Sequence, residues 1–76
     1  MAETMGDRIR EARIARRMSQ EDAASEADLS RVTWARLEND EIDNPYLSTM
    51  LQVAGALRVS LEALIGEKKS VPRPKM

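Results

Sequence analysis

The sequence predicts an all-α fold, and three observations support this. Apolar residues recur at spacings of three and four along most of the chain, as they do on one face of a helix. Serine residues precede several of these apolar rows, where helix caps belong. Hydrophobic residues make up 42% of the chain but aromatic residues only 3%, so the core must consist of Leu, Ile, Val, Met and Ala, which suit helices. The 76 residues suffice for one domain with one core.

The first predicted helix spans residues 7–17, a segment without Gly or Pro. Met5, Ile9 and Ala12 follow one another at spacings of four and three, which marks the buried face. Residues 1–6 are expected to form a short N-terminal extension.

The next two predicted helices are short, and each starts at a serine. Ser19 is followed three residues later by Asp22, close to the capping-box pattern. Ser30 is placed to cap a third helix over residues 31–38, in which Trp34 and Leu37 are expected to point inward. The small-residue face of the second helix consists of Ala23, Ala24 and Ala27.

A polar loop is predicted over residues 39–44, with Ile42 as its exposed apolar residue. Pro45 then suits the entry to a fourth helix. This helix has the clearest apolar row in the chain, and we expect the whole row to be core. Its members are Leu47, Met50, Leu51, Ala54 and Leu57.

A final short helix is predicted between Ser60, a candidate cap, and Gly66, which fits a C-terminal cap. Residues 67–76 combine positive charge with two prolines and are expected to form a basic, disordered tail. The predicted domain therefore covers residues 7–66. The apolar residues of the last helix are Leu61, Leu64 and Ile65.

The composition excludes several classes of function. The chain contains neither Cys nor His, which removes thiolate and imidazole metal ligands and the commonest nucleophile and general base. The carboxylates follow no recognisable pocket motif, so we expect no enzyme activity, no metal and no cofactor. No apolar run approaches the roughly 20 residues of a membrane span, and no signal peptide is recognisable. A soluble, cytoplasmic protein without a membrane partner is expected.

Two short helices joined by a tight turn form a DNA-reading unit when the second helix can enter the major groove. Residues 20–39 have this layout. Arginine donates two parallel hydrogen bonds to O6 and N7 of guanine, and valine contacts the methyl group of thymine. The predicted outward residues of the second of these helices are Arg31, Val32, Thr33 and Arg36.

Phosphate contacts are expected around this unit. Gln20 can place a backbone amide and a side-chain amide against a phosphate. The net charge of −1 argues weakly against a nucleic-acid partner, but five of the 12 Lys and Arg residues lie within residues 8–17. Further candidates for phosphate contacts are Arg16, Arg17, Thr33 and Asn39.

Five segments occur in the order and spacing of a known family: RIREAR (8–13), SQEDAA (19–24), LSRVTWARLE (29–38), NP (44–45) and LQVAGALRVSL (51–61). Over residues 7–66 the chain resembles the phage-repressor-like helix-turn-helix family, also called the Cro/cI or XRE type. The resemblance implies a five-helix, lambda-repressor-like DNA-binding domain.

The resemblance also implies a function. A member of this family is a transcriptional regulator, here expected to be a repressor or an autoregulator, that binds double-stranded DNA at a near-palindromic operator as a homodimer. Activation, through an acidic surface that contacts polymerase, is the alternative outcome of binding. The family's phosphate-contacting positions fall on Gln20 and Asn39, and Arg13 and Glu38 match an ion pair between the first helix and the end of the third. Its base-reading positions fall on Ser30, Arg31, Val32 and Arg36.

The chain departs from the family pattern in its core and turns. Trp34 stands where Ile or Val is usual, and we expect its larger volume to fill the space left by Ala12 and Ala23, where Leu is usual. Asp28 and Asp40 stand where the family's turns usually have Gly.

The loop after the third helix is acidic where the family often has Lys or Arg. Asp40, Glu41 and Asp43 are expected to repel phosphate, which predicts modest affinity or a backbone contact moved to the first helix and the tail. The alternative function is an antitoxin or a protein-interaction module on the same scaffold, since a fold does not determine a function. Its protein partner would bind the acidic loop, residues 40–43.

Overall fold

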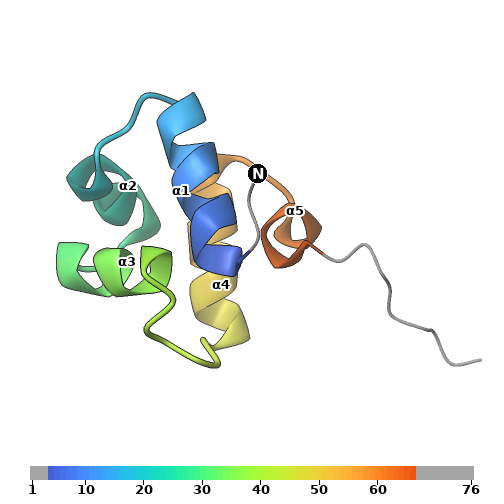
Figure 1. Ribbon diagram of the computed structural model, residues 1–76. Coiled ribbons are helices and arrows are strands. Elements are labelled where there is room, and N and C mark those ends of the chain that lie inside the picture. Colours follow the sequence, from blue (N-terminus) through green and yellow to red (C-terminus); the bar gives the residue numbers. More distant parts are fainter. Residues whose placement is uncertain (1–3, 67–76) are drawn as a thin grey trace, which may run out of the picture.

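Five helices and their connections form the part of the chain that the computed structural model describes, residues 4–66 (Figure 1). The helices are α1 (Met5–Ala15), α2 (Gln20–Ala27), α3 (Arg31–Glu38), α4 (Leu47–Leu57) and α5 (Leu61–Ile65). Residues 4–66 contain no strand, and the prediction of an all-α, five-helix domain is confirmed. The predicted tail, residues 67–76, lies outside the described residues.

Helices α1 and α4 pack against each other in the middle of the molecule (Figure 1). Helices α2 and α3 lie on one side of this pair and α5 on the other. Helix α3 packs against α1 and α2 on one face, and no described helix covers its other face. It is therefore a surface helix.

Side-chain caps determine where most of these helices begin. Ser19 and Asp22 form the capping box, and Ser30 and Ser60 accept from backbone N–H groups three residues ahead, so all three predicted serine caps are confirmed. Gly66 ends α5 with φ 68°, as predicted.

The predicted bounds of the first helix, 7–17, were wrong at both ends. Thr4 Oγ1 accepts from the backbone N–H of Asp7 at 3.0 Å, so α1 begins at residue 5. Arg17 adopts a left-handed conformation, φ 59°, which ends the helical path and leaves α1 finishing at Ala15.

The core cluster buries the expected inward pair of α3, Trp34 and Leu37. Trp34 is 0% exposed and belongs to the same cluster as Ala23, also 0% exposed, while Ala12 packs against that cluster from its edge. A full-sized indole and two small side chains thus share one core.

Only part of the predicted apolar row of α4 is buried. Leu47 and Leu51 are 63% and 53% exposed, so their assignment to the core was wrong. They lie one turn apart on the side of α4 that adjoins the buried face. The buried face consists of Met50, Val53, Ala54, Ala56 and Leu57.

Candidate nucleic-acid interface

The turn between α2 and α3 brings the two helices together as a helix-turn-helix unit. Asp28 adopts a left-handed conformation, φ 63°, and the backbone N–H of Leu29 then donates to the carbonyl of Ala24 at 2.9 Å. Leu29 packs against the core, and Ser30 caps α3 at once. The chain therefore changes direction within three residues and packs α3 against α2.

The outer face of α3 carries the residues that the sequence placed there. Arg31, Val32 and Arg36 are exposed, with Val32 at 66%, whereas Thr33 is half-buried. Ser30 is occupied by its cap, because its hydroxyl accepts from the backbone of Thr33 and donates to Thr33 Oγ1 at 2.9 Å. Two arginines and one apolar side chain thus form the exposed part of this surface.

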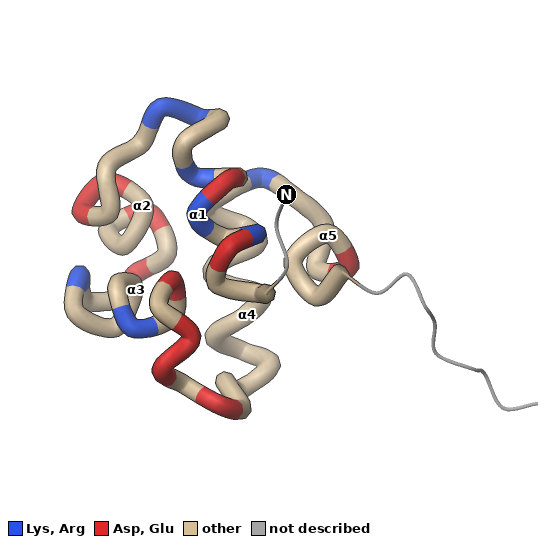
Figure 2. The backbone as a smooth tube through the Cα atoms, in the orientation of Figure 1, with Lys and Arg blue, Asp and Glu red and all other residues tan. Residues whose placement is uncertain are grey.

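The candidate phosphate-binding residues are dispersed. Arg16 and Arg17 are exposed in the α1–α2 turn, which lies well away from α3 in Figure 2. Asn39 is exposed at the C-terminal end of α3. Gln20, at the start of α2, is half-buried, and its side-chain Nε2 donates to Glu38 Oε1 at 3.1 Å. The backbone N–H of Gln20 lies in the first turn of α2, where it has no acceptor within the helix and can donate to a phosphate.

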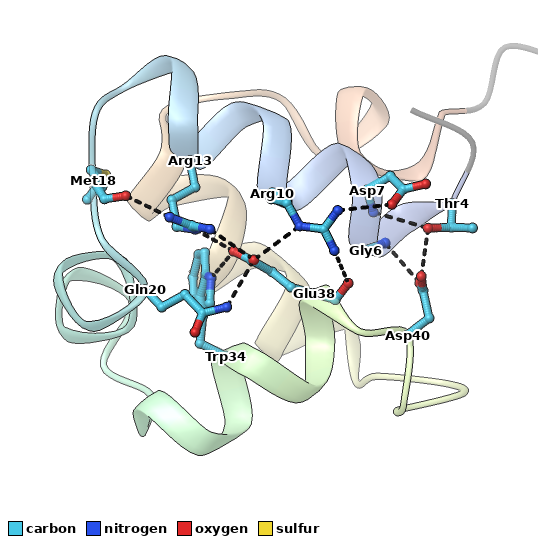
Figure 3. Close-up of polar contacts among 10 residues, drawn as sticks. All are labelled: Thr4, Gly6, Asp7, Arg10, Arg13, Met18, Gln20, Trp34, Glu38 and Asp40. Atoms are coloured by element: carbon cyan, nitrogen blue, oxygen red, sulfur yellow. Dashed lines mark hydrogen bonds and ion pairs between the residues drawn. The ribbon is translucent and has the colours of Figure 1, made fainter. Parts of the chain in front are cut away.

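The carboxylate of Glu38 is a polar hub behind α3 (Figure 3). The residue is only 2% exposed, yet it accepts from both Nε and Nη2 of Arg13 and from Trp34 Nε1 at 2.6 Å. With the bond from Gln20, one carboxylate collects donors from α1, α2 and α3. The ion pair of Arg13 with Glu38 thus joins the first helix to the end of the third.

Burial alone raises the pKa of Glu38, because a charged form loses hydration. The hydrogen bonds from Arg13, Trp34 and Gln20, together with the charge of Arg13, outweigh burial and bring the pKa below its ordinary value. Glu38 is therefore ionised at neutral pH and holds its donors as a carboxylate.

No local pattern in the sequence indicates the indole hydrogen bond from Trp34 to Glu38. The two residues are four positions apart on α3, a spacing that brings side chains together on one helix face, but the same spacing also suits a purely apolar contact. Only the buried position of both side chains makes the bond necessary, since a buried indole N–H needs an acceptor.

The acidic loop differs from the row of free carboxylates that the sequence suggested. Asp40 accepts from Thr4 Oγ1 at 2.6 Å and from the backbone N–H of Gly6 at 2.9 Å, at the first turn of α1 (Figure 3). Glu41 forms an ion pair with Arg36. Ile42, expected to be exposed, is half-buried against the core. Asp43 remains an exposed carboxylate.

Three arginines of α1 are engaged within the domain rather than facing outward. Arg8 donates to the carbonyls of Leu64 and Ile65 at the end of α5, at 2.8 and 3.0 Å. Arg10 pairs with Asp7 at 3.4 Å and also lies 3.7 Å from Glu38 Oε1, and Arg13 is bound in the hub. A compensating backbone contact from the first helix is therefore restricted to the exposed α1–α2 turn.

Residues 4–66 contain no group of three or more acidic side chains arranged to hold a metal ion. None of the helices in this range is long and apolar enough to cross a membrane. Two open hollows on this part of the surface are lined in part by Leu29 and Arg31 and by Leu47 and Ile65, respectively.

Comparison with known proteins gives a consistent result. The sequence pattern of a family described as "Helix-turn-helix domain" matches residues 4–65. The immunity repressor protein of Bacillus phage phi105 is 43% identical over 65 residues, which are 86% of this chain and 44% of that protein. The chain thus spans less than half the length of this relative.

Solved structures agree with that match. The P22 c2 repressor in complex with a synthetic operator superposes with a TM-score of 0.77 at 27% identity, over 83% of this chain and 94% of that one. The restriction-modification controller protein C.AhdI from Aeromonas hydrophila superposes with a TM-score of 0.76 at 33% identity, over 80% and 91%. This chain therefore belongs to the helix-turn-helix family, and its fold is that of the phage-repressor-like, Cro/cI or XRE type.

Proposed function

We propose that this chain is a sequence-specific transcriptional regulator that places α3 in the major groove of double-stranded DNA. The observation that carries the proposal is the two-sided character of α3: its inner face is buried through Trp34, Leu37 and Glu38, while its outer face is exposed. A rigid helix with one free polar face is what major-groove readout requires. The family is not one of enzymes, which agrees with the expectation from the sequence.

Arg31 and Arg36 are the proposed guanine-reading residues, and Val32 lies between them for an apolar contact. Ser30 is a proposed base-contacting residue whose hydroxyl must share its cap with the DNA. The proposed phosphate contacts come from the N-terminal turn of α2 at Gln20, from the α1–α2 turn, and from Thr33 and Asn39.

Repression of transcription is the proposed outcome of binding. The phage phi105 relative is named an immunity repressor, and the P22 c2 structure contains an operator. A domain that covers promoter DNA blocks polymerase sterically, without needing any ligand. We propose that this chain acts in that way.

We also propose that the chain binds a near-palindromic operator as a homodimer, which would place two α3 helices about 34 Å apart. The support is an exposed apolar surface away from α3: Leu47, Leu51 and Ile65 are each about half exposed or more. Val59 and Leu61, in the α4–α5 turn and at the start of α5, pack against the domain's own core and are not part of this surface.

Sedimentation equilibrium tests the dimer. Leu51→Lys should weaken self-association, whereas Ser48→Lys, which adds the same charge at an exposed polar position of α4, should not. A wild-type protein that stays monomeric at high concentration and binds DNA one copy per site would contradict this part of the proposal.

The alternative role as a protein-interaction module loses support from the structure. Its proposed surface, the acidic loop 40–43, has one carboxylate bound to α1, one paired with Arg36 and one apolar residue packed inward. Asp43 alone is left without such a contact in residues 4–66. DNA readout through α3 is the function that the geometry supports best.

The proposal is tested by selecting binding sites from randomised duplex DNA and then measuring affinity for the selected and a scrambled duplex. Arg31→Ala and Arg36→Ala should each cost about 1–3 kcal/mol on the selected site and relax the base preference at one position. Arg58→Ala, which removes the same charge from an exposed position in the α4–α5 turn, should leave that preference intact. Failure to enrich any sequence would overturn the proposal.

A further inference from the structure

Four of the five helices end in the same backbone motif. In each, a left-handed residue follows the helix, its N–H donates to the carbonyl three positions back, and the next N–H donates five positions back. The left-handed residues are Arg17, Asp28, Asp40 and Arg58. The residue after each of them is Met18, Leu29, Glu41 and Val59, respectively.

This position ordinarily holds an apolar residue that packs back over the last turn of the helix. Met18, Leu29 and Val59 follow the rule and pack against the core. Glu41, at the end of α3, is exposed instead, and the apolar contact is made one residue later by Ile42. Among these four helix ends, a carboxylate thus stands at this position only at the end of α3, the helix that carries the proposed DNA-reading face.

The backbone fixes where this carboxylate lies. The N–H of Glu41 donates to the carbonyl of Arg36 at 2.9 Å, and that of Asp40 to the carbonyl of Leu37 at 3.2 Å. The side chain of Asp40 is in turn bound to the first turn of α1. The main chain of Glu41 is thus held beside α3 because the turn is bound at both ends, and from there its side chain reaches Arg36.

The contact itself leaves much of Arg36 available. Glu41 Oε1 lies 3.6 Å from Nε of Arg36, and the two side chains are 54% and 56% exposed. The two terminal nitrogens of the guanidinium, which carry four of its five N–H groups, are not used in this ion pair. They remain free to donate in parallel to O6 and N7 of a guanine.

We propose that Glu41 is a specificity-determining residue, which positions Arg36 and cancels its charge so that the guanidinium selects guanine over phosphate. The inference rests on the proposed function. Attraction to phosphate is Coulombic and follows net charge, whereas base readout depends on the direction of the donors. The Glu41 carboxylate beside Nε of Arg36 reduces the attraction to phosphate and leaves the terminal N–H groups directed for base readout.

The same arrangement accounts for an acidic loop beside a DNA-reading helix. In Figure 2 the loop after α3, coloured red, runs directly from the helix that carries exposed arginines. Glu41 lowers affinity for every phosphate backbone, but it lowers it least where Arg36 finds a guanine. The carboxylate thereby lowers the affinity for DNA in general and raises the ratio of specific to non-specific binding.

The test measures affinity for the selected duplex and for a scrambled duplex at several salt concentrations. Glu41→Gln should strengthen binding to scrambled DNA about fivefold and steepen its salt dependence by about 0.9 in log–log slope, as one freed charge takes up one phosphate. Affinity for the selected duplex should change less than about twofold, so the specificity ratio falls about fivefold. Glu41→Asp, which keeps the charge, should retain the wild-type ratio.

Two controls isolate the ion pair. Asp43→Asn removes the same charge from the same loop without touching Arg36, and should shift both duplexes by the same factor. In an Arg36→Ala background, Glu41→Gln should no longer change the ratio, since its effect is exerted through Arg36. Circular dichroism melts check that each variant is folded.

The outcomes separate the inference from the proposed function. A wild-type protein that does not distinguish the two duplexes overturns the proposed function, and the inference with it. A selective wild-type protein whose ratio is unaffected by Glu41→Gln, or equally affected by Asp43→Asn, overturns the inference alone. A ratio that still falls in the Arg36→Ala background also overturns it.

Discussion

Replacing Glu38 with alanine removes the acceptor of four hydrogen bonds that come from three helices. The guanidinium of Arg13, whose side chain is 14% exposed, would keep its charge without a counter-charge. The indole N–H of Trp34, which is fully buried, would lose its acceptor. Glu38→Ala therefore leaves the buried donor of Trp34 and the partly buried donors of Arg13 and Gln20 without their acceptor at once.

The expected loss follows from these orphaned groups. Removing one partner of a buried ion pair costs about 3–5 kcal/mol, most of it from the unpaired charge that remains. The side chain of Arg13 keeps some access to water, so we expect the lower half of this range, about 3–4 kcal/mol. A domain of this size has a free energy of unfolding near the lower end of about 5–15 kcal/mol, so the loss takes most of it.

Urea unfolding followed by circular dichroism at 222 nm measures this loss. Glu11→Ala removes an exposed carboxylate from α1 and should change the free energy of unfolding by no more than about 0.5 kcal/mol. The double variant Arg13→Met, Glu38→Leu should recover part of the loss, because a buried ion pair replaced by apolar residues is often neutral. A loss below about 1 kcal/mol for Glu38→Ala would refute the reasoning.

Three further predictions concern the same domain. Trp34→Phe removes the indole N–H but keeps most of the ring, and should cost about 1–3 kcal/mol in urea unfolding, less than the roughly 3–5 kcal/mol expected for Trp34→Ala; no measurable loss for Trp34→Phe would show that the hydrogen bond to Glu38 contributes nothing. The pKa of Glu38 is lowered in the folded protein, so its stabilisation is present above its unfolded-state pKa, about 4.3, and is lost as the pH falls through the lower folded-state pKa; unfolding curves between pH 7 and pH 3 should therefore decline less steeply in Glu38→Gln than in wild type. Gly6→Ala would drive a methyl group into the backbone carbonyl of Glu38 and the carboxylate of Asp40 and should cost about 1–3 kcal/mol, whereas Gly55→Ala meets no atom within 4 Å and should stabilise α4 by about 0.5–1 kcal/mol; thermal melts that rank the two variants the other way would contradict this account.

The features that the sequence predicted well depend on neighbours along the chain. Ser19, Ser30 and Ser60 cap their helices through the backbone three residues ahead, and a signal of that range is visible in any window of a few residues. The inward pair of α3 follows in the same way from helical spacing. The existence, order and type of all five helices could therefore be read from local pattern alone.

The features that the sequence did not predict depend on contacts between distant segments. Leu47 and Leu51 belong to an apolar row as regular as the buried one, and periodicity cannot tell which of two adjoining rows faces the core. Asp40 was read as a free acid because its partners, Thr4 and Gly6, lie more than 30 positions away. The residues of the candidate interface were identified from spacing, but their engagement by Glu38 and Glu41 needed the fold.

The left-handed residues that end α1 and α4 are arginines rather than glycines. A residue with a Cβ atom gives up about 1–2 kcal/mol in that conformation, which glycine adopts freely. Both positions lie in turns outside α3, so relief of this strain would not alter the reading face. Substitution of these two arginines by glycine would therefore relieve backbone strain at the ends of α1 and α4 and raise the melting temperature of the domain. The base preference of α3 should stay the same.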